Sequence, residues 1–223
     1  MKYRHEYKQL IPPKEAELLI KRLGAVMPRD GHDGGAGYIV SSLYFDSFDD
    51  RALREKLSGV NMREKFRLRV YDGCFDEVWL EKKSKINGLC SKSRCTVSQA
   101  EAQRIITLGA LYTPQEKPPL LAELSGKMAS QALRPKTIIE YRRRAFVFPA
   151  GNVRVTLDGD IRTGLGCTDF FDADRLTIPA RETATVLEVK WDEFLPDVIR
   201  GLVQPGCART ESFSKYAAGR VYG

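Results

Sequence analysis

Charged side chains recur at every second position in several segments of this 223-residue chain, and arginine and lysine dominate them. Residues i and i+2 of a strand lie on one face of a sheet, so each set predicts a strand with one polar face. Several strands of this kind predict a shared polar lumen, and guanidinium groups at this spacing can grip successive phosphates. The sets are Arg4 with Glu6 and Lys8; Arg67 with Arg69; Glu81 with Lys83; Arg154 with Thr156 and Asp158; and Glu188 with Lys190.

The predicted lumen carries a large excess of positive charge. Eleven cations and four anions fall on it, an excess of 11 minus 4, or seven. Crowded like charges that lose hydration are tolerated mainly when a polyanion or counterions lie among them. Guanidinium groups with their fixed geometry, together with the point charges of lysines, suit a triphosphate or a longer phosphate chain. The few carboxylates on the same face could hold Mg²⁺ or Mn²⁺. The cations are Arg4, Lys8, Arg67, Arg69, Lys83, Lys92, Arg94, Arg143, Arg154, Lys190 and Lys215; the anions are Glu6, Glu81, Asp158 and Glu188.

Composition alone leaves the class of polyanion open. A net charge of +7 fits nucleic acid, a membrane surface or a phosphorylated small molecule. Five cysteines without a CxxC pair argue against a disulfide framework and a structural zinc site, and favour a reducing cytosol. No stretch approaches the roughly 20 apolar residues of a membrane span. We therefore expect a cytoplasmic protein that could be peripheral to a membrane through a membrane-protein neighbour.

Alternation and turn signals predict the elements that carry these residues. Asp72-Gly73 and Asn87-Gly88 are hairpin turns that separate three strands. Strands are expected at Tyr3–Ile11, Tyr38–Phe45, Glu64–Tyr71, Glu77–Lys83, Ser91–Val97, Thr137–Phe148, Asn152–Ile161 and Thr183–Trp191. Helices are expected at Lys14–Gly24, Ser47–Leu57, Ser98–Gly109, Pro118–Leu133, Glu193–Val203 and Ser212–Ala218.

Antiparallel hairpins with inserted helices exclude a doubly wound sheet. They predict an α+β fold, a closed antiparallel eight-stranded β tunnel with helices packed on the outside. Closure would remove exposed strand edges, and the helices would cover the apolar outer face. We expect residues 1–223 to form one domain.

Eight short motifs, in order along nearly the whole chain, resemble the VTC polyphosphate polymerase domain, a member of the triphosphate tunnel metalloenzymes with their CYTH-like relatives. They are Arg4–Lys8, Ser42–Asp46, Arg67–Arg69, Glu81–Lys83, Tyr141–Arg143, Val153–Asp158, Leu187–Lys190 and Phe213–Tyr216. Hydrolases and cyclases of that superfamily usually begin Glu-x-Glu-x-Lys, whereas Arg4 stands at the first of these positions here. This departure matches the VTC branch and favours chain transfer.

The resemblance also implies roles for individual residues. Tyr141 and Ser214 would add hydrogen bonds to phosphate, and Glu188 would bind the divalent metal. From the predicted faces, Lys190, Lys92 and Arg94 join the substrate-binding set, and Glu6 and Glu81 join the candidate metal ligands. The residues expected to contact phosphates during catalysis are Lys8, Arg67, Arg69, Lys83, Arg143, Arg154 and Lys215.

The expected activity is a metal-dependent phosphotransferase that moves the terminal phosphate of ATP to a growing polyphosphate chain, with Mn²⁺ or Mg²⁺. An acceptor phosphate is already an anionic nucleophile, so no general base is needed. Hydrolysis of tri- or polyphosphate and non-catalytic binding of polyphosphate or inositol phosphate stay open. Nucleic acid is not expected, because no aromatic platform alternates with the cations.

Simpler explanations stay open for some residues. Glu188 could pair with Lys190 or an arginine instead of binding a metal, and Tyr141 could serve packing. Lys92 and Arg94 could be ordinary surface charge. The sequence does not predict the oligomeric state.

Overall fold

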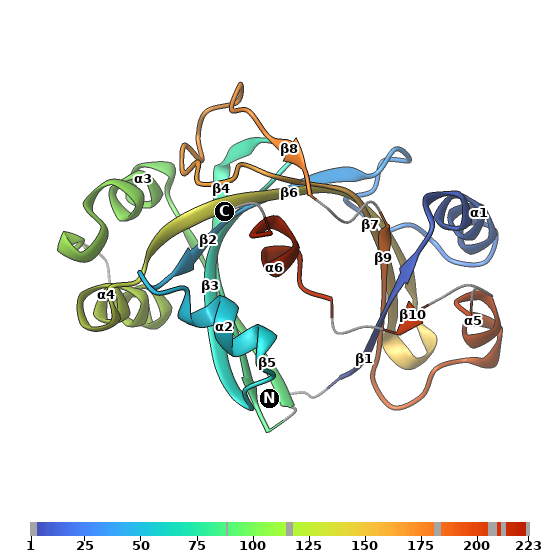
Figure 1. Ribbon diagram of the computed structural model, residues 1–223. Helices are drawn as coiled ribbons and strands as arrows, with labels where there is room; N and C mark the ends of the chain where they lie inside the picture. The colour runs from blue at the N-terminus through green and yellow to red at the C-terminus, as the bar shows by residue number, and fades with distance from the viewer. Residues whose placement is uncertain are drawn as a thin grey trace.

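One strongly curved antiparallel sheet dominates the computed structural model, which describes residues 4–87, 89–114, 118–180, 184–204, 209–210 and 213–221 (Figure 1). The strand order is β10-β1-β9-β7-β6-β2-β3-β4-β5, and β8 pairs with β7. The strands are β1 (His5–Ile11), β2 (Tyr38–Asp46), β3 (Met62–Tyr71), β4 (Cys74–Ile86), β5 (Leu89–Val97), β6 (Arg134–Phe148), β7 (Val153–Thr163), β8 (Ile178–Pro179), β9 (Thr185–Trp191) and β10 (Arg209–Thr210).

The prediction of a closed tunnel is corrected to an open half-barrel. Within the described residues the sheet ends at β5 on one side and β10 on the other, and no ladder joins these two strands. The arc is open between β5 and β1 in Figure 1. Side-chain alternation predicts which face of a strand is polar, but closure depends on strand tilt and register stagger, which alternation does not report.

The eight long strands lie where alternation predicts them, with ends that differ by at most three described residues. Two strands of two residues each, β8 and β10, were not predicted, because two residues are too short to show a period. Four residues of the predicted elements, Tyr3, Gly88, Thr183 and Ser212, lie outside the described residues. The turn between β3 and β4 has positive φ at Asp72 (48°) and Gly73 (67°), which suits a two-residue hairpin.

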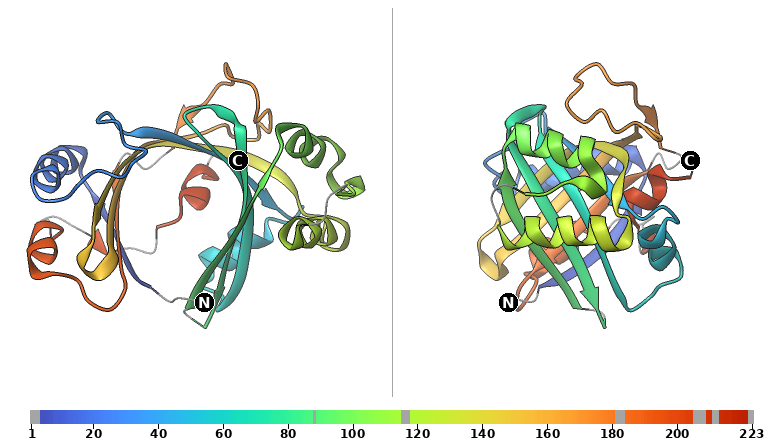
Figure 2. Two further views of the ribbon diagram at one scale, coloured as in Figure 1. Left: turned by 180° about the vertical axis from the view of Figure 1, so that it is seen from behind. Right: turned by 90° about the vertical axis from the view of Figure 1, so that its left-hand side faces the viewer.

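Helices lie on both sides of the sheet. They are α1 (Pro13–Gly24), α2 (Arg51–Leu57), α3 (Gln99–Leu108), α4 (Pro119–Gln131), α5 (Asp197–Leu202) and α6 (Lys215–Gly219), with 3-10 turns η1 (Gly109–Leu111) and η2 (Ala150–Asn152). Helices α1 and α5 cover one part of the outer face, and α3 and α4 cover another (Figure 2). Helix α6 instead lies inside the curve (Figure 1), so the expectation that all helices pack outside is wrong for α6.

Two apolar cores fill the outer face of the sheet. One packs Phe66, Leu68 and Leu80 beneath α3 and α4. The other packs Val155 and Leu187 beneath α1 and α5. Since these side chains alternate with charged ones, burying them outside leaves the charged side chains on the concave face.

Helix α2 begins at Arg51, later than the predicted start at Ser47. The carboxylate of Asp46 accepts hydrogen bonds from the backbone N–H groups of Ala52 and Leu53, at 2.8 and 3.1 Å. Asp46 therefore satisfies N–H groups of the first turn together with Ser47, whose hydroxyl accepts a 3.0 Å hydrogen bond from the backbone N–H of Arg51, while the side chain of Asp50 makes no capping hydrogen bond.

No described helix is both long and apolar enough to cross a bilayer. The longest, α4, has 13 residues.

Candidate functional site

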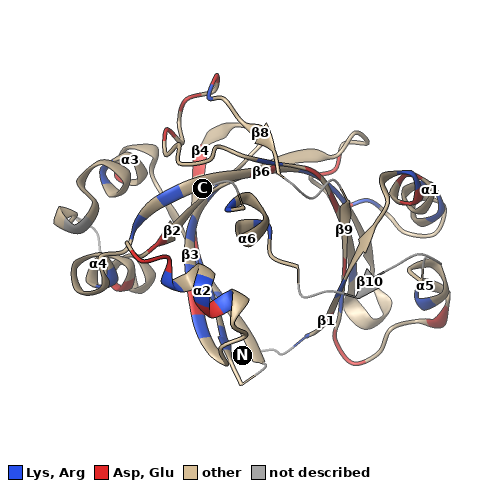
Figure 3. Ribbon diagram, viewed as in Figure 1, with Lys and Arg blue, Asp and Glu red and all other residues tan. Residues whose placement is uncertain are grey.

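The concave face gathers cations from seven strands, β1, β3, β4, β5, β6, β7 and β9, and from α6. Lys and Arg recur along β3 and on α6, which faces it (Figure 3). Strand register sets the neighbours: Lys8 pairs with Glu188 between β1 and β9, and Lys190 pairs with Arg154 between β9 and β7. Because directly paired residues share a face, these charged residues of β1, β9 and β7 lie side by side.

Glu81 is the anionic centre of a cluster on β3, β4 and β5. Its carboxylate lies 2.7 Å from Arg67 Nη2 and 3.4 Å from Arg69 Nη1, and it also contacts Lys92 Nζ. Burial raises the pKa of Glu81, but Arg67, Arg69 and Lys92 lower it by more, so the pKa lies well below its usual range. Glu81 therefore stays ionised and holds the two arginines side by side.

Asp158, on β7, is the anionic centre of a second cluster, whose cations come from β6 and α6. Its carboxylate accepts two hydrogen bonds from Arg143, at 2.6 and 2.8 Å, and lies 2.7 Å from Lys215 Nζ. Burial raises the pKa of Asp158, but Arg143 and Lys215 lower it more, from 3.8 to about 2. This ion pair also shows why α6 lies inside the curve, since Lys215 is bound to the concave face.

Glu6 and Glu188 form a third cluster, with lysines. Lys8 Nζ lies 2.6 Å from Glu6 and 3.6 Å from Glu188, and Lys190 Nζ lies 2.6 Å from Glu188 and 3.7 Å from Glu6. Lys83 Nζ lies 3.8 Å from Glu6 across the open side of the curve. Burial lowers the pKa of Lys8, but Glu188 and Glu6 raise it above its usual range. Glu188 thus forms the ion pair with Lys190 that the sequence left open.

Tyr141 orients two of the predicted phosphate ligands. Its hydroxyl accepts hydrogen bonds from Arg69 (3.4 Å) and Arg143 (3.3 Å), and Lys215 Nζ lies 4.7 Å from its ring centroid. Tyr141 is buried on the concave side. The side chain therefore fixes three cations from β3, β6 and α6 around one point.

The remaining predicted residues have other partners or are exposed. Arg154 pairs with Asp30 at 2.9 Å. Arg94 is exposed and stacks 4.4 Å above the ring of Trp79, and Lys92 is also exposed. Ser214 accepts a hydrogen bond from the backbone N–H of Ala217, which caps α6.

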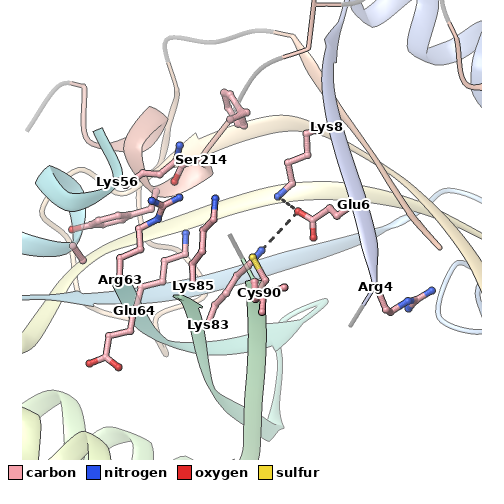
Figure 4. Close-up of a pocket in the computed structure, with 15 residues that line it drawn as sticks. Arg4, Glu6, Lys8, Lys56, Arg63, Glu64, Lys83, Lys85, Cys90 and Ser214 are labelled. Atoms are coloured by element: carbon pink, nitrogen blue, oxygen red, sulfur yellow. Dashed lines mark ion pairs between the residues drawn. The ribbon is translucent and has the colours of Figure 1, made fainter. Parts of the chain in front are cut away.

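A cavity of about 390 Å³ opens between β1, β3, β4, β5, α2 and the start of α6 (Figure 4). The residues from the predicted lumen and site that line it are Arg4, Glu6, Lys8, Lys83 and Ser214. Counting only the described residues, seven cations and two carboxylates line this cavity, which suits an anionic ligand. They are Arg4, Lys8, Lys56, Arg63, Lys65, Lys83 and Lys85, with Glu6 and Glu64.

Four of these cations were missed by the sequence analysis. Arg63 and Lys65 continue the spacing of Arg67 and Arg69, and Lys85 continues that of Lys83, so alternation carried a usable signal for three of them. Lys56 lies on α2, and a strand period cannot detect a helical residue. Arg4 points away from Lys8 in Figure 4 and pairs with Asp192 at 2.8 Å.

The three predicted metal ligands do not form one cluster. Among the described residues, no group of three or more His, Cys, Asp or Glu side chains has metal-binding geometry. Glu6 and Glu188 share Lys8 and Lys190, whereas Glu81 is held by Arg67, Arg69 and Lys92. Glu6 with Glu188 fits a hard cation that takes most of its ligands from substrate phosphates and water, and Glu81 does not.

Comparison with known proteins shows similar folds and the family of this chain. No curated protein matches the chain significantly by sequence. A protein of Bacillus halodurans assigned as an adenylate cyclase has a similar structure, with a TM-score of 0.52 and 14% identity over 85% of this chain and 80% of that one. The PH1819 protein of Pyrococcus horikoshii has a TM-score of 0.50 and 12% identity over 96% and 97%. At these identities the likeness concerns the fold alone. The VTC domain model matches residues 3–222, and this chain therefore belongs to the VTC domain family.

Proposed function

We propose that this chain is a polyphosphate polymerase, a phosphotransferase that moves the terminal phosphate of ATP onto a growing polyphosphate chain. Membership of the VTC domain family supports a triphosphate-type substrate. The observation that carries the proposal is the set of linked cations on the concave face. Lys190 pairs in register with Arg154 and shares Glu188 with Lys8, which lines the 390 Å³ cavity, while Arg69 and Arg143 share Tyr141. A set of cations of this size can bind several phosphates at once.

Phosphoryl transfer depends mainly on positioning and on neutralising the charge of the transferred group. Arg67, Arg69 and Arg143 are suited to that task, because Glu81, Asp158 and Tyr141 hold their guanidinium groups before any ligand arrives. Lysines line the cavity, and their flexible point charges suit a chain that must advance. We assign the arginines to the reacting triphosphate and the cavity lysines to the chain.

A general base is not part of the proposal. The chain has two histidines, and neither lines the cavity. His5 stacks on Trp191 with ring centroids 5.3 Å apart, and His32 stacks near Tyr71 at 6.4 Å. A phosphate acceptor needs no such base because it is already anionic, whereas activation of water would benefit from one.

A divalent cation completes the proposed site. Glu188 and Glu6 would hold Mn²⁺ or Mg²⁺ together with phosphate oxygens, and the cation would neutralise charge on the transferred phosphate. Lys8 and Lys190 limit the negative charge of the two carboxylates, so we expect metal to bind with the triphosphate rather than to the protein alone.

The test is product analysis with purified protein, ATP and Mn²⁺, followed by separation of the products on a gel. The proposal predicts a ladder of polyphosphate and stoichiometric ADP. Arg67→Ala should abolish the ladder, while Arg104→Ala on the outer helix α3 should leave it unchanged. Orthophosphate without polymer would instead identify a hydrolase.

Binding without turnover is the second candidate, and one observation favours it. Each of the carboxylates Glu81, Asp158 and Glu188 already has at least two cationic partners. A site of this kind can retain polyphosphate or an inositol phosphate without a metal. Tight binding of tripolyphosphate with no consumption of ATP would support this candidate over the polymerase.

A further inference from the structure

Tyr44 lies between the phosphate-binding cations and α6. It pairs in register with Arg67 between β2 and β3, and its hydroxyl accepts a 2.9 Å hydrogen bond from Arg67 Nη1. The Arg67 guanidinium and Lys65 Nζ each lie 5.7 Å from its ring centroid. On its other side, the ring of Tyr216 stacks at 5.0 Å with an interplanar angle of 25°. Tyr44 is only 2% exposed.

This environment stabilises a negative charge on the Tyr44 oxygen. Burial raises the pKa of Tyr44, but Arg67, Lys65 and Arg69 lower it by more, from 10.0 to about 7. Tyr216, its neighbour on α6, behaves in the opposite way, because burial and Asp46 raise the pKa of Tyr216 well above its usual range. The two stacked phenols are thus electrostatically different, and only Tyr44 faces the cations.

We propose that Tyr44 is a positioning residue. Its hydroxyl oxygen holds Arg67 in the free protein, and this oxygen takes up a proton when a phosphate chain replaces it as the partner of Arg67. This inference rests on the proposed phosphate binding but not on turnover. A phosphate oxygen near Arg67 competes with the phenolate for the guanidinium group. As Arg67 turns to the phosphate, one proton from solvent binds Tyr44 Oη, so the phenolate becomes a neutral phenol.

Other charged and titratable groups around Tyr44 determine which control variants the experiment needs. On β3, Lys65 and Arg69 face it, and on β4 Glu81 reaches it through Arg67. On α6, the Tyr216 hydroxyl donates a hydrogen bond to Asp46 at 2.7 Å. Burial lowers the pKa of Lys65 to about 8, so Lys65 is the other group in contact with Tyr44 that titrates near neutral pH.

The first measurement uses the wild-type protein. Phenolate absorbs at longer ultraviolet wavelength than phenol, and it can be followed by difference absorbance from pH 5.5 to 8.5, a range centred on about 7. We expect one phenolate to form with a midpoint near 7 in the free protein, and this step to move upward by about one pH unit or more when tripolyphosphate saturates the site. Tyr7 and Tyr112 do not interfere, since burial raises the pKa of both to about 12 or above. A free protein without this step would overturn the inference.

The second measurement is proton uptake on binding of tripolyphosphate, obtained by calorimetry at pH 7 in buffers of different ionisation enthalpy. A group with a pKa of about 7 is half deprotonated at pH 7, so we expect about half a proton per ligand from Tyr44. Lys65→Arg serves as the background because it keeps the charge and removes the lysine titration. In this background, adding Tyr44→Phe should remove the uptake of about half a proton per ligand that is assigned to Tyr44, and adding Tyr7→Phe should not.

The outcomes separate this inference from the proposed function. Equal proton uptake with and without the Tyr44 hydroxyl would overturn the inference while leaving phosphate binding and turnover in place. Proton uptake that depends on Tyr44 in a protein that makes no polymer would support the inference and contradict the polymerase. Absence of any tripolyphosphate binding would overturn both.

Discussion

Arg143 and Asp158 lie directly opposite each other in the register of β6 and β7, and two hydrogen bonds of 2.6 and 2.8 Å join their side chains. Lys215 on α6 completes the group at 2.7 Å from the same carboxylate. Asp158 is fully buried. One anion therefore holds a predicted phosphate ligand from the sheet and another from the inner helix.

Asp158→Asn should lower the free energy of unfolding by about 3 kcal/mol, because it leaves Arg143 and Lys215 without their counter-charge. Urea unfolding of the two proteins measures this difference. Tripolyphosphate should restore more stability to the variant than to the wild type, since the ligand supplies the missing negative charge. Equal stability of the two proteins without ligand would show that the ion pair contributes nothing net.

Stability should also fall in acid. The pKa of Asp158 is about 2 in the folded protein, and those of Glu81 and Glu188 are also lowered despite burial, chiefly by Arg67 and by Lys190 respectively. A carboxyl with a lower pKa in the folded state stabilises the fold above its unfolded value of 3.8, and the contribution disappears as pH falls through the folded value.

We therefore expect Asp158 alone to account for about 2 kcal/mol of the unfolding free energy lost between about pH 5 and 2. Urea unfolding at a series of pH values should show a weaker acid dependence for Asp158→Asn than for the wild type. Parallel curves would mean that Asp158 is not ionised as described.

Arg67→Ala should weaken tripolyphosphate binding by about 10- to 100-fold, the effect of losing charge-assisted hydrogen bonds of about 1.5–3 kcal/mol. The fold should persist, because Arg69 and Lys92 still neutralise Glu81. Arg104→Ala is the matched control, since Arg104 lies on the outer helix α3. Calorimetry with the wild type and the two variants measures the affinity for tripolyphosphate. An unchanged affinity in Arg67→Ala would show that Arg67 does not bind the ligand.

Two glutamates should differ in their effect on metal. Glu188→Gln should lower the Mn²⁺ stimulation of turnover at least about tenfold, because Glu188 is the more buried of the pair proposed to hold the cation. Glu81→Gln should leave the Mn²⁺ concentration for half-maximal activity unchanged, although it disturbs Arg67 and Arg69. The same metal dependence in both variants would contradict the assignment.

The strands of the half-barrel and their polar faces could be predicted from the sequence, because polar and apolar side chains alternate along them. Arg67 and Arg69 against Phe66 and Leu68 report both a strand and its polar face, and the structure confirms that assignment. Closure could not be predicted in the same way, because alternation within a strand is insensitive to how the first and last strands meet.

The site was harder to predict where it depends on elements far apart in the chain. Lys56 enters the cavity from α2, and Tyr44 meets Tyr216 only because α6 folds into the curve. The separation of Glu81 from Glu6 and Glu188 likewise follows from the three-dimensional path of the sheet. The residue types and their alternation along the strands put all three glutamates on one face, but did not show with which cations each glutamate pairs.

The most direct test follows the terminal phosphate of ATP. Purified protein is incubated with Mn²⁺ and ATP labelled in that phosphate, and the label is divided between orthophosphate and material longer than triphosphate. The proposed function predicts that most of the label enters the longer material in the wild type and none does in Arg67→Ala. Label found only in orthophosphate, or left in ATP, would contradict the assignment of this VTC domain protein as a polyphosphate polymerase.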